Sequence, residues 1–172
     1  MSPWSFAAVL GVAALVAAQA SGGTPGSPGA VVARVADGDT LTLLTGERVR
    51  LLQIDAPEVG TEECWSQAAR RALLGLAPVG ARVTLEIDPG LDRTDRYGRL
   101  LRYVRRGGLN VNLELVRRGA ATPYFYGGDR GRYAARLLAA ARAAKASGRG
   151  LWGAHPRTRL EPGRQIDTGR CD

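Results

Sequence analysis

The chain of 172 residues is long enough for one globular domain with a short appendage, and a domain of that size buries a core without metals or disulfides. Hydrophobic residues make up 45% and charged residues 23%, which excludes the intrinsically disordered class. The formal net charge is +8, and Lys145 is the only lysine. Because guanidinium groups bind phosphate oxygens in a bidentate fork, this composition favours polyanionic partners: nucleic acid, anionic lipid or acidic glycan.

The N-terminus has the pattern of an export signal. Phe6 to Ala20 is an apolar, alanine-rich run that ends in Ala18-Gln19-Ala20, a small-x-small cleavage pattern. The run is shorter than the roughly 20 apolar residues of a spanning helix. We expect residues 1–20 to be a signal peptide and residues 21–29 a flexible linker, with the protein secreted or in the periplasm or cell envelope and no membrane span after cleavage. Because no Lys or Arg precedes the run, a buried N-terminal helix is the alternative.

The regular elements follow in a clear order. The predicted strands are short β-type runs separated by turn signals, and they cover residues 31–35, 41–44, 48–54, 82–87 and 99–104. The predicted helices have apolar residues at helical spacing, and they cover residues 66–76, 110–118 and 131–147. A meander, a helix and a hairpin in this order predict an α+β, mainly β fold: a five-stranded Greek-key barrel of OB type with three helices. The domain would span residues 30–153, followed by an irregular tail at 154–172.

Cys64 and Cys171 are the two cysteines of the chain. An oxidising compartment would permit them to pair, and the bridge would tie the C-terminal tail to the segment after Glu58. Two separate thiols are the alternative. A zinc site is not expected, because two cysteines and the single histidine, His155, lack ligand spacing.

Several charged residues lie at ends of strands or inside one. Asp39 opens one predicted strand and Asp55 ends another, so neighbouring antiparallel strands can bring both to one end of the barrel. Two carboxylates with a backbone carbonyl form an oxygen-rich site for calcium or magnesium. Arg50 lies within an apolar strand, which is costly unless it faces a polar cleft or a partner. Strand alternation places Arg50 and Asp55 on opposite faces, so a bulge or a bend toward Pro57 has to bring them together.

Each of these residues also has a structural interpretation. Asp37 and Asp39 are common turn formers beside glycine, and Asp55 and Glu58 could cap the following segment. Arg99 could keep a strand edge soluble. The rings of Tyr124 and Tyr126 could simply pack in the core or at its rim.

Three motifs stand out along the chain: Asp37-Gly38-Asp39-Thr40, the stretch from Arg50 to Glu58, and Arg93-Thr94-Asp95-Arg96-Tyr97-Gly98-Arg99. Taken together, they resemble the signature of the staphylococcal nuclease, or thermonuclease, family. The resemblance runs in order from Ala30 to Trp152. It extends through Val111-Asn112, Leu115 to Gly119, Tyr124-Phe125-Tyr126 and Leu151-Trp152.

The resemblance implies a role for each matching position. The calcium ligands of the family fall on the side chains of Asp39 and Asp55 and on the backbone carbonyl of Ala56. Arg50 and Arg99 match the arginines that hold the scissile phosphate, and Glu58 matches the glutamate that activates or positions the attacking water. The positions of the nucleotide pocket are Arg96, Tyr124 and Tyr126.

The activity implied is that of a calcium-dependent phosphodiesterase, an endonuclease that hydrolyses DNA and RNA with little sequence preference, as a monomer without an obligate protein partner. The alternative is a noncatalytic nucleic-acid-binding OB module of the cell envelope. An intact set of Asp39, Arg50, Asp55, Glu58 and Arg99 favours the enzyme. The segment 59–67 departs from the staphylococcal pattern: it is shorter, lacks lysines, and carries Glu62 and Glu63.

Overall fold

The computed structural model describes Met1, residues 30–61 and residues 63–170. The predicted signal peptide and linker, Glu62 and Cys171 lie outside these residues, apart from Met1. Within the described part, five strands form a closed barrel, and they are β1 (Ala30–Val35), β2 (Thr40–Leu43), β3 (Arg48–Leu51), β5 (Arg82–Glu86) and β6 (Leu100–Arg106). The fold predicted from the sequence is confirmed.

One parallel pairing closes the barrel. The order β3-β2-β1-β5-β6 is antiparallel throughout, and β3 then pairs with β6 in parallel, with Val49 opposite Leu100. Short strands extend this frame: β7 (Leu109–Asn110) pairs with β6, while β4 (Ile54–Asp55) pairs with β8 (Thr122–Pro123). Because the β4–β8 pair continues from β3, it fixes the segment that carries Asp55 beside the end of the barrel.

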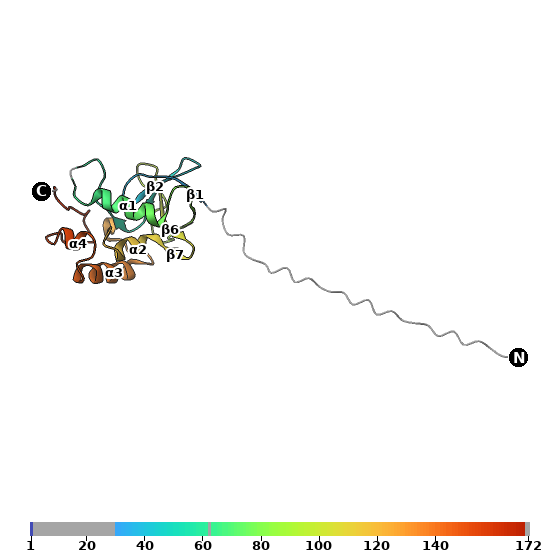
Figure 1. The fold of residues 1–172 in the computed structure, drawn as a ribbon. Helices are drawn as coiled ribbons and strands as arrows, with labels where there is room; N and C mark the ends of the chain where they lie inside the picture. Colours follow the sequence, from blue (N-terminus) through green and yellow to red (C-terminus); the bar gives the residue numbers. More distant parts are fainter. Residues whose placement is uncertain (2–29, 62, 171–172) are drawn as a thin grey trace.

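The helices pack through small and apolar side chains. The helices are α1 (Ser66–Leu76), α2 (Val111–Arg117), α3 (Ala134–Ala146) and the short α4 (Leu151–Ala154), with a 3-10 turn, η1 (Tyr126–Gly128). In Figure 1, α2 lies between α1 and α3, and it contacts both. Leu73 of α1, Leu115 of α2 and Leu137 of α3 are fully buried in one core with the barrel strands. No helix among the described residues is long and apolar enough to cross a bilayer.

Two predicted boundaries need correction. The strand predicted over residues 48–54 stops at Leu51, because Gln53 takes a left-handed conformation with φ of 59°. The helix predicted from residue 131 begins at Ala134. The amides of Gly131 and Arg132 donate to the side chains of Gln53 and Asp88, which hold this segment in a turn before the helix.

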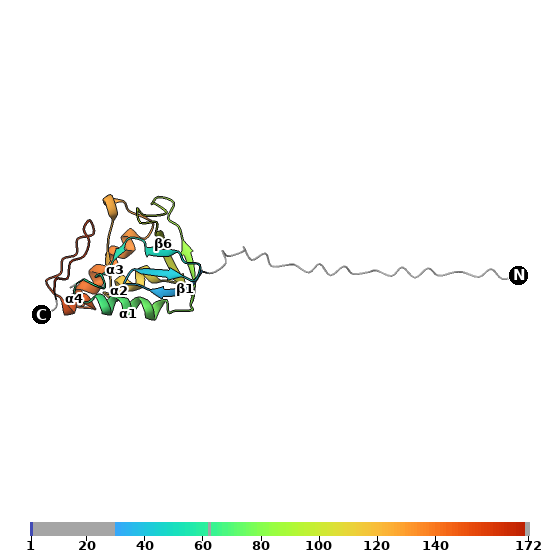
Figure 2. The same cartoon turned by 90° about the horizontal axis from the view of Figure 1, so that it is seen from above.

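The C-terminal segment after α4 is irregular, as predicted, but it is packed against the domain. Thr158 and Ile166 are buried, and Ile166 joins Leu151 and Trp152 in a second, small apolar cluster. Figure 2 shows the segment running beside α4 at one side of the molecule. The C-terminal segment is therefore a packed part of the domain.

Candidate active site

The Asp37–Asp39 turn is held in place by close packing. The amide of Asp39 donates to Asp37 Oδ1 over 3.0 Å, and Thr40 Oγ1 donates to Asp39 Oδ1 over 3.0 Å. A Cβ atom at Gly38 would lie 2.6 Å from the Cβ atoms of both Ala56 and Ala69, far inside contact distance. Glycine is thus required because α1 and the segment after β4 approach the turn there.

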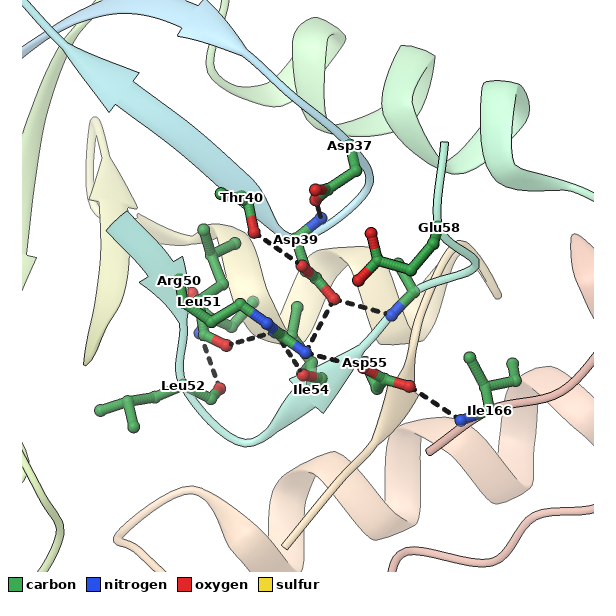
Figure 3. Close-up of polar contacts among 12 residues, drawn as sticks. Asp37, Asp39, Thr40, Arg50, Leu51, Leu52, Ile54, Asp55, Glu58 and Ile166 are labelled. Carbon is green, nitrogen blue, oxygen red and sulfur yellow. Dashed lines mark hydrogen bonds and ion pairs between the residues drawn. The ribbon is translucent and has the colours of Figure 1, made fainter. Parts of the chain in front are cut away.

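Asp39 and Asp55 meet at the guanidinium group of Arg50. Arg50 Nη2 lies 3.0 Å from Asp39 Oδ2 and 2.7 Å from Asp55 Oδ1 (Figure 3). Its Nη1 donates to the carbonyls of Leu51 and Ile54, at 3.1 and 2.7 Å. Asp39 Oδ2 also accepts the amide of Ala56 over 2.8 Å. Asp39 and Asp55 therefore converge at one end of the barrel, as predicted. The buried charge of Arg50 is paired with both carboxylates and bonded to two carbonyls.

The bend that makes this geometry possible lies at Gln53. A left-handed residue between β3 and β4 reverses the alternation of side chains, so Arg50 and Asp55 face each other although five residues separate them. The expected bulge or bend toward Pro57 is therefore found earlier, at Gln53. The Gln53 side chain secures the turn: Nε2 donates to the Asp129 carbonyl over 2.8 Å, and Oε1 accepts the Gly131 amide over 3.0 Å.

The electrostatic balance of this cluster is negative. Burial raises the pKa of Asp39 well above its ordinary value, although Arg50 opposes the shift. Burial also raises the pKa of Asp55 and of Glu58, and the charge of Asp37 adds to both shifts. For Arg50, burial alone would lower the pKa, but Asp39 and Asp55 outweigh it and raise it. Arg50 thus faces four carboxyl groups, Asp37, Asp39, Asp55 and Glu58, with Arg99 as a further positive charge acting on Glu58. Negative charge is therefore in excess in this cluster.

This cluster fits a hard divalent cation. Asp39 and Asp55 offer carboxylate oxygens within hydrogen-bond distance of one nitrogen, the carbonyl of the buried Ala56 lies next in the chain, and the uncompensated negative charge favours a cation. Among the described residues, no group of three or more His, Cys, Asp and Glu side chains could hold a metal by itself. A bound ion would therefore depend on two carboxylates supplemented by the carbonyl and water.

Arg99 is oriented by Asp95. Arg99 Nε lies 2.7 Å from Asp95 Oδ2, while the amides of Arg99 and Tyr97 donate to Asp95 Oδ1 over 3.0 and 2.9 Å. Burial alone would raise the pKa of Asp95, but these donors outweigh it and lower it. The carboxylate is thus the preferred form, and it fixes the direction of the Arg99 side chain. The neighbouring Arg96 lies over the ring of Tyr97, with its guanidinium carbon 4.8 Å from the ring centre.

A pocket of about 500 Å³, here called the active-site pocket, opens over Arg50. Six of the predicted site residues line it: Arg50, Glu58, Arg96, Arg99, Tyr124 and Tyr126. Asp39 and Asp55 are buried below it and contact it through Arg50. Six of the predicted site residues therefore line one cavity, and Asp39 and Asp55 contact its lining through Arg50. The role of each residue stays a prediction.

Residues 48–154, more than half of the chain, match the family described as staphylococcal nuclease homologue. The chain belongs to this family. The resemblance found in the sequence is thereby confirmed.

Curated relatives of this family member carry the name endonuclease. Endonuclease YhcR of Bacillus subtilis (strain 168) is 34% identical over 137 residues, covering 71% of this chain and 11% of that protein. An uncharacterized endonuclease of Haemophilus influenzae is 34% identical over 125 residues, 70% of this chain and 64% of the relative. Endonuclease YncB of Bacillus subtilis (strain 168) is 35% identical over 95 residues, 51% and 44% respectively. The chain spans less than two thirds of each of these relatives.

Sequence reasoning missed the residues of this staphylococcal nuclease homologue that support the site. Gln53 and Asp95 orient the site, as described, and neither carries a sequence signal of its own beyond polarity within a motif. Ile166 was also missed: its amide donates to Asp55 Oδ2 over 2.8 Å (Figure 3). A backbone donor 111 residues away leaves no trace in the sequence.

The loop after Glu58 folds back on itself. The Glu63 carboxylate accepts the amide of Glu58 over 2.6 Å, and Thr61 Oγ1 donates to the Glu58 carbonyl over 2.8 Å. The Glu63 carboxylate is thus engaged in holding the Glu58 backbone. Glu62 lies outside the described residues.

The cysteine prediction stays open, because Cys171 lies outside the described residues. The pairing requires the C-terminal segment to run beside Cys64, and it does: the Cys64 amide donates to the Gly169 carbonyl over 2.9 Å. Thr168 Oγ1 donates to the Cys64 carbonyl over 2.7 Å. The bridge remains a prediction with favourable backbone placement.

Proposed function

We propose that this protein is a calcium-dependent nuclease that hydrolyses the phosphodiester bonds of DNA and RNA with little sequence preference. The observation that carries the proposal is the Asp39–Arg50–Asp55 cluster under a pocket that Glu58 and Arg99 also line. Membership of the staphylococcal nuclease homologue family and relatives named endonuclease support it.

The side chains of Asp39 and Asp55 and the carbonyl of Ala56 would hold the ion. Bound there, calcium would supply positive charge near the scissile phosphate. Arg50 and Arg99 bind the oxygens of that phosphate and stabilise the negative charge that develops as water attacks. Arg99 is already held in direction by Asp95, so its side chain needs little reorganisation during the reaction.

Glu58 is the group that accepts a proton from the attacking water or orients it. It lines the same pocket as both arginines, and its backbone is held by Glu63 and Thr61. Arg96, Tyr124 and Tyr126 bind the nucleotide next to the scissile bond. A tyrosine ring that stacks on a base contributes about 1–3 kcal/mol largely irrespective of sequence, so single-stranded substrates are favoured.

The deciding experiment is cleavage of a labelled single-stranded DNA and of an RNA of the same sequence, with calcium or with excess chelator. Wild type is compared with Glu58→Gln and Arg99→Ala, and with Arg71→Ala as the control, because Arg71 is an exposed residue of α1 that does not line the active-site pocket. We expect calcium-dependent cleavage that falls about 10²–10³-fold in the two site variants. Binding without cleavage under any divalent metal would instead establish the noncatalytic OB module.

We further propose that the protein is exported, on the strength of the signal pattern over residues 1–20. Expression with and without residues 1–20, followed by fractionation of culture medium, envelope and cytoplasm, tests this. Retention of both forms in the cytoplasm would overturn it.

A further inference from the structure

A second and larger cavity lies next to the active-site pocket. It has a volume of about 770 Å³ and is lined by residues 154–159, 161 and 164–170, together with Cys64 and Thr122; we call it the C-terminal pocket. Most of its wall lies beyond the residues that match the nuclease family, which end at Ala154. Nothing in the proposed chemistry uses it.

The C-terminal pocket is built on a fixed segment. Four contacts anchor that segment to the domain: Lys145 Nζ donates to the Thr158 carbonyl over 2.9 Å, the Phe125 amide to the Pro162 carbonyl over 2.6 Å, the Ile166 amide to Asp55 Oδ2 over 2.8 Å, and the Cys64 amide to the Gly169 carbonyl over 2.9 Å. Because the C-terminal segment is held at these four points, its side chains have a defined arrangement around the pocket.

The lining of the C-terminal pocket is rich in arginine. The arginines are Arg157, Arg159, Arg164 and Arg170, against two acidic residues, Glu161 and Asp167. Glu161 pairs only loosely, at 3.8 Å from Arg159 Nη1 and 3.7 Å from Arg164 Nη1, and these arginine side chains are 84% and 81% exposed. Asp167 accepts the Gly169 amide. Two guanidinium groups are thus available to a phosphate.

The two pockets meet at one residue. Gln165 lines both, and the next residue, Ile166, binds Asp55 under the active-site pocket. A single strand of nucleic acid whose scissile phosphate lies over Arg50 can therefore continue past Gln165 to Arg159 and Arg164. A membrane surface fits less well, because the cavity is a recess beside a nucleotide-sized pocket, whereas a single strand can follow a curved, basic path.

We propose that the C-terminal pocket binds the sugar–phosphate backbone of the substrate strand, several nucleotides from the bond that is cut. Arg159 and Arg164 make the phosphate contacts. This inference rests on the proposed nuclease function. It predicts that the segment after Ala154 makes the protein bind long single strands more tightly than short ones.

The test compares Arg159→Gln/Arg164→Gln with Arg71→Gln/Arg142→Gln. The control pair removes the same charge from exposed arginines of α1 and α3 that line neither pocket. Binding of labelled single-stranded 3-mers and 20-mers is measured in a Glu58→Gln background with calcium, and cleavage of both is measured with Glu58 intact. Circular dichroism and urea unfolding verify that all variants fold.

We expect the double variant to raise the Kd for the 20-mer about 10-fold and to leave the Kd for the 3-mer unchanged. The slope of log Kd against log salt should fall by about 1.4, for two lost contacts to single-strand phosphates. An equal loss for both lengths, the same loss in the control pair, or no loss would overturn the proposal. If the wild type cuts DNA and the double variant binds the 20-mer normally, only this inference fails; if the wild type neither binds nor cuts, the proposed function fails with it.

Discussion

At the scale of single residues, Arg50 joins the ends of three segments. Its two terminal nitrogens reach Asp39, Asp55 and the carbonyls of Leu51 and Ile54. A lysine keeps the charge but has one nitrogen and no planar fork, so it cannot satisfy these partners together.

We therefore predict that Arg50→Lys lowers kcat/KM for single-stranded DNA about 10²-fold and reduces the free energy of unfolding by about 1–3 kcal/mol. Cleavage kinetics and urea unfolding measure the two effects. The control, Arg71→Lys, should change neither. A fully active lysine variant would show that the bidentate geometry is not used.

Asp95 provides a second prediction at this scale. Asp95→Asn keeps the size of the side chain but removes the charge that holds Arg99 Nε at 2.7 Å. We expect kcat/KM to fall about 10-fold, since a misdirected donor loses part of the roughly 10²–10³-fold effect of a full deletion. A positioning role further predicts that Asp95→Asn adds little to Arg99→Ala in the double variant. Additive losses in that cycle would contradict it.

Which residues of the site could be predicted depends on where their signal lies. Asp39, Arg50 and Glu58 are charged residues in short motifs, so the sequence indicates them. Gln53 acts through an unusual backbone conformation and through side-chain hydrogen bonds to backbone groups far along the chain, and Ile166 acts through its backbone amide. Neither leaves a recognisable pattern in the sequence. The motifs thus indicate the charged groups of the candidate site, while the contributions of Gln53 and Ile166 appear only in the fold.

At the scale of elements, the turn at Gln53 decides which way β4 faces. A left-handed backbone is rare for residues other than glycine, and it is most strained for a β-branched side chain. Gln53 adopts it at φ of 59° while its side chain bonds Asp129 and Gly131.

We predict that Gln53→Val destabilises the protein by about 2–4 kcal/mol, from the backbone strain together with the lost hydrogen bonds. Asparagine tolerates this conformation, so Gln53→Asn should cost clearly less. Urea unfolding of the three proteins tests the order. Equal stability of the valine and asparagine variants would show that the turn relaxes at no cost.

The elements themselves were predictable where local pattern and tertiary contacts agree. The helix over residues 66–76 has the predicted bounds, because Ala69, Leu73 and Leu76 form its buried face. The strand over 48–54 was predicted too long, since the run of apolar residues continues past Leu51 and no glycine or proline marks the turn. The start of α3 was placed early because the segment before it forms a turn held by the distant side chains of Gln53 and Asp88, which no local pattern indicates.

At the scale of the whole molecule, Asp88 connects the end of β5 to β6 and to the segment before α3. Its carboxylate accepts the amides of Gly90 and Arg132 and the hydroxyl of Tyr103. Burial alone would raise the pKa of Asp88, but these donors outweigh it and lower the pKa below its ordinary value of 3.8.

Because the folded pKa of Asp88 is lowered, its contribution to stability is present above pH 3.8 and is lost as the pH falls through the lowered folded pKa. We predict that Asp88→Asn costs about 1–3 kcal/mol at neutral pH. The difference from wild type should shrink as urea unfolding is repeated at progressively lower pH below 3.8. A difference that is constant with pH would show that the charge of Asp88 is not what stabilises the connection.

The C-terminal segment reaches across the molecule to the site, since the Ile166 amide binds Asp55 Oδ2. Ile166→Pro removes this donor, and Ile166→Ala removes most of the apolar side chain but keeps the amide, so the pair separates the two contributions. We predict that both variants lose about 1–3 kcal/mol of stability, whereas only the proline variant loses activity well below its unfolding transition, about 10-fold in kcat/KM. Equal activities at equal folded fraction would mean that the segment stabilises the domain without orienting Asp55. An activity loss confined to the proline variant would make this segment, outside the family's matched region, a part of the catalytic structure.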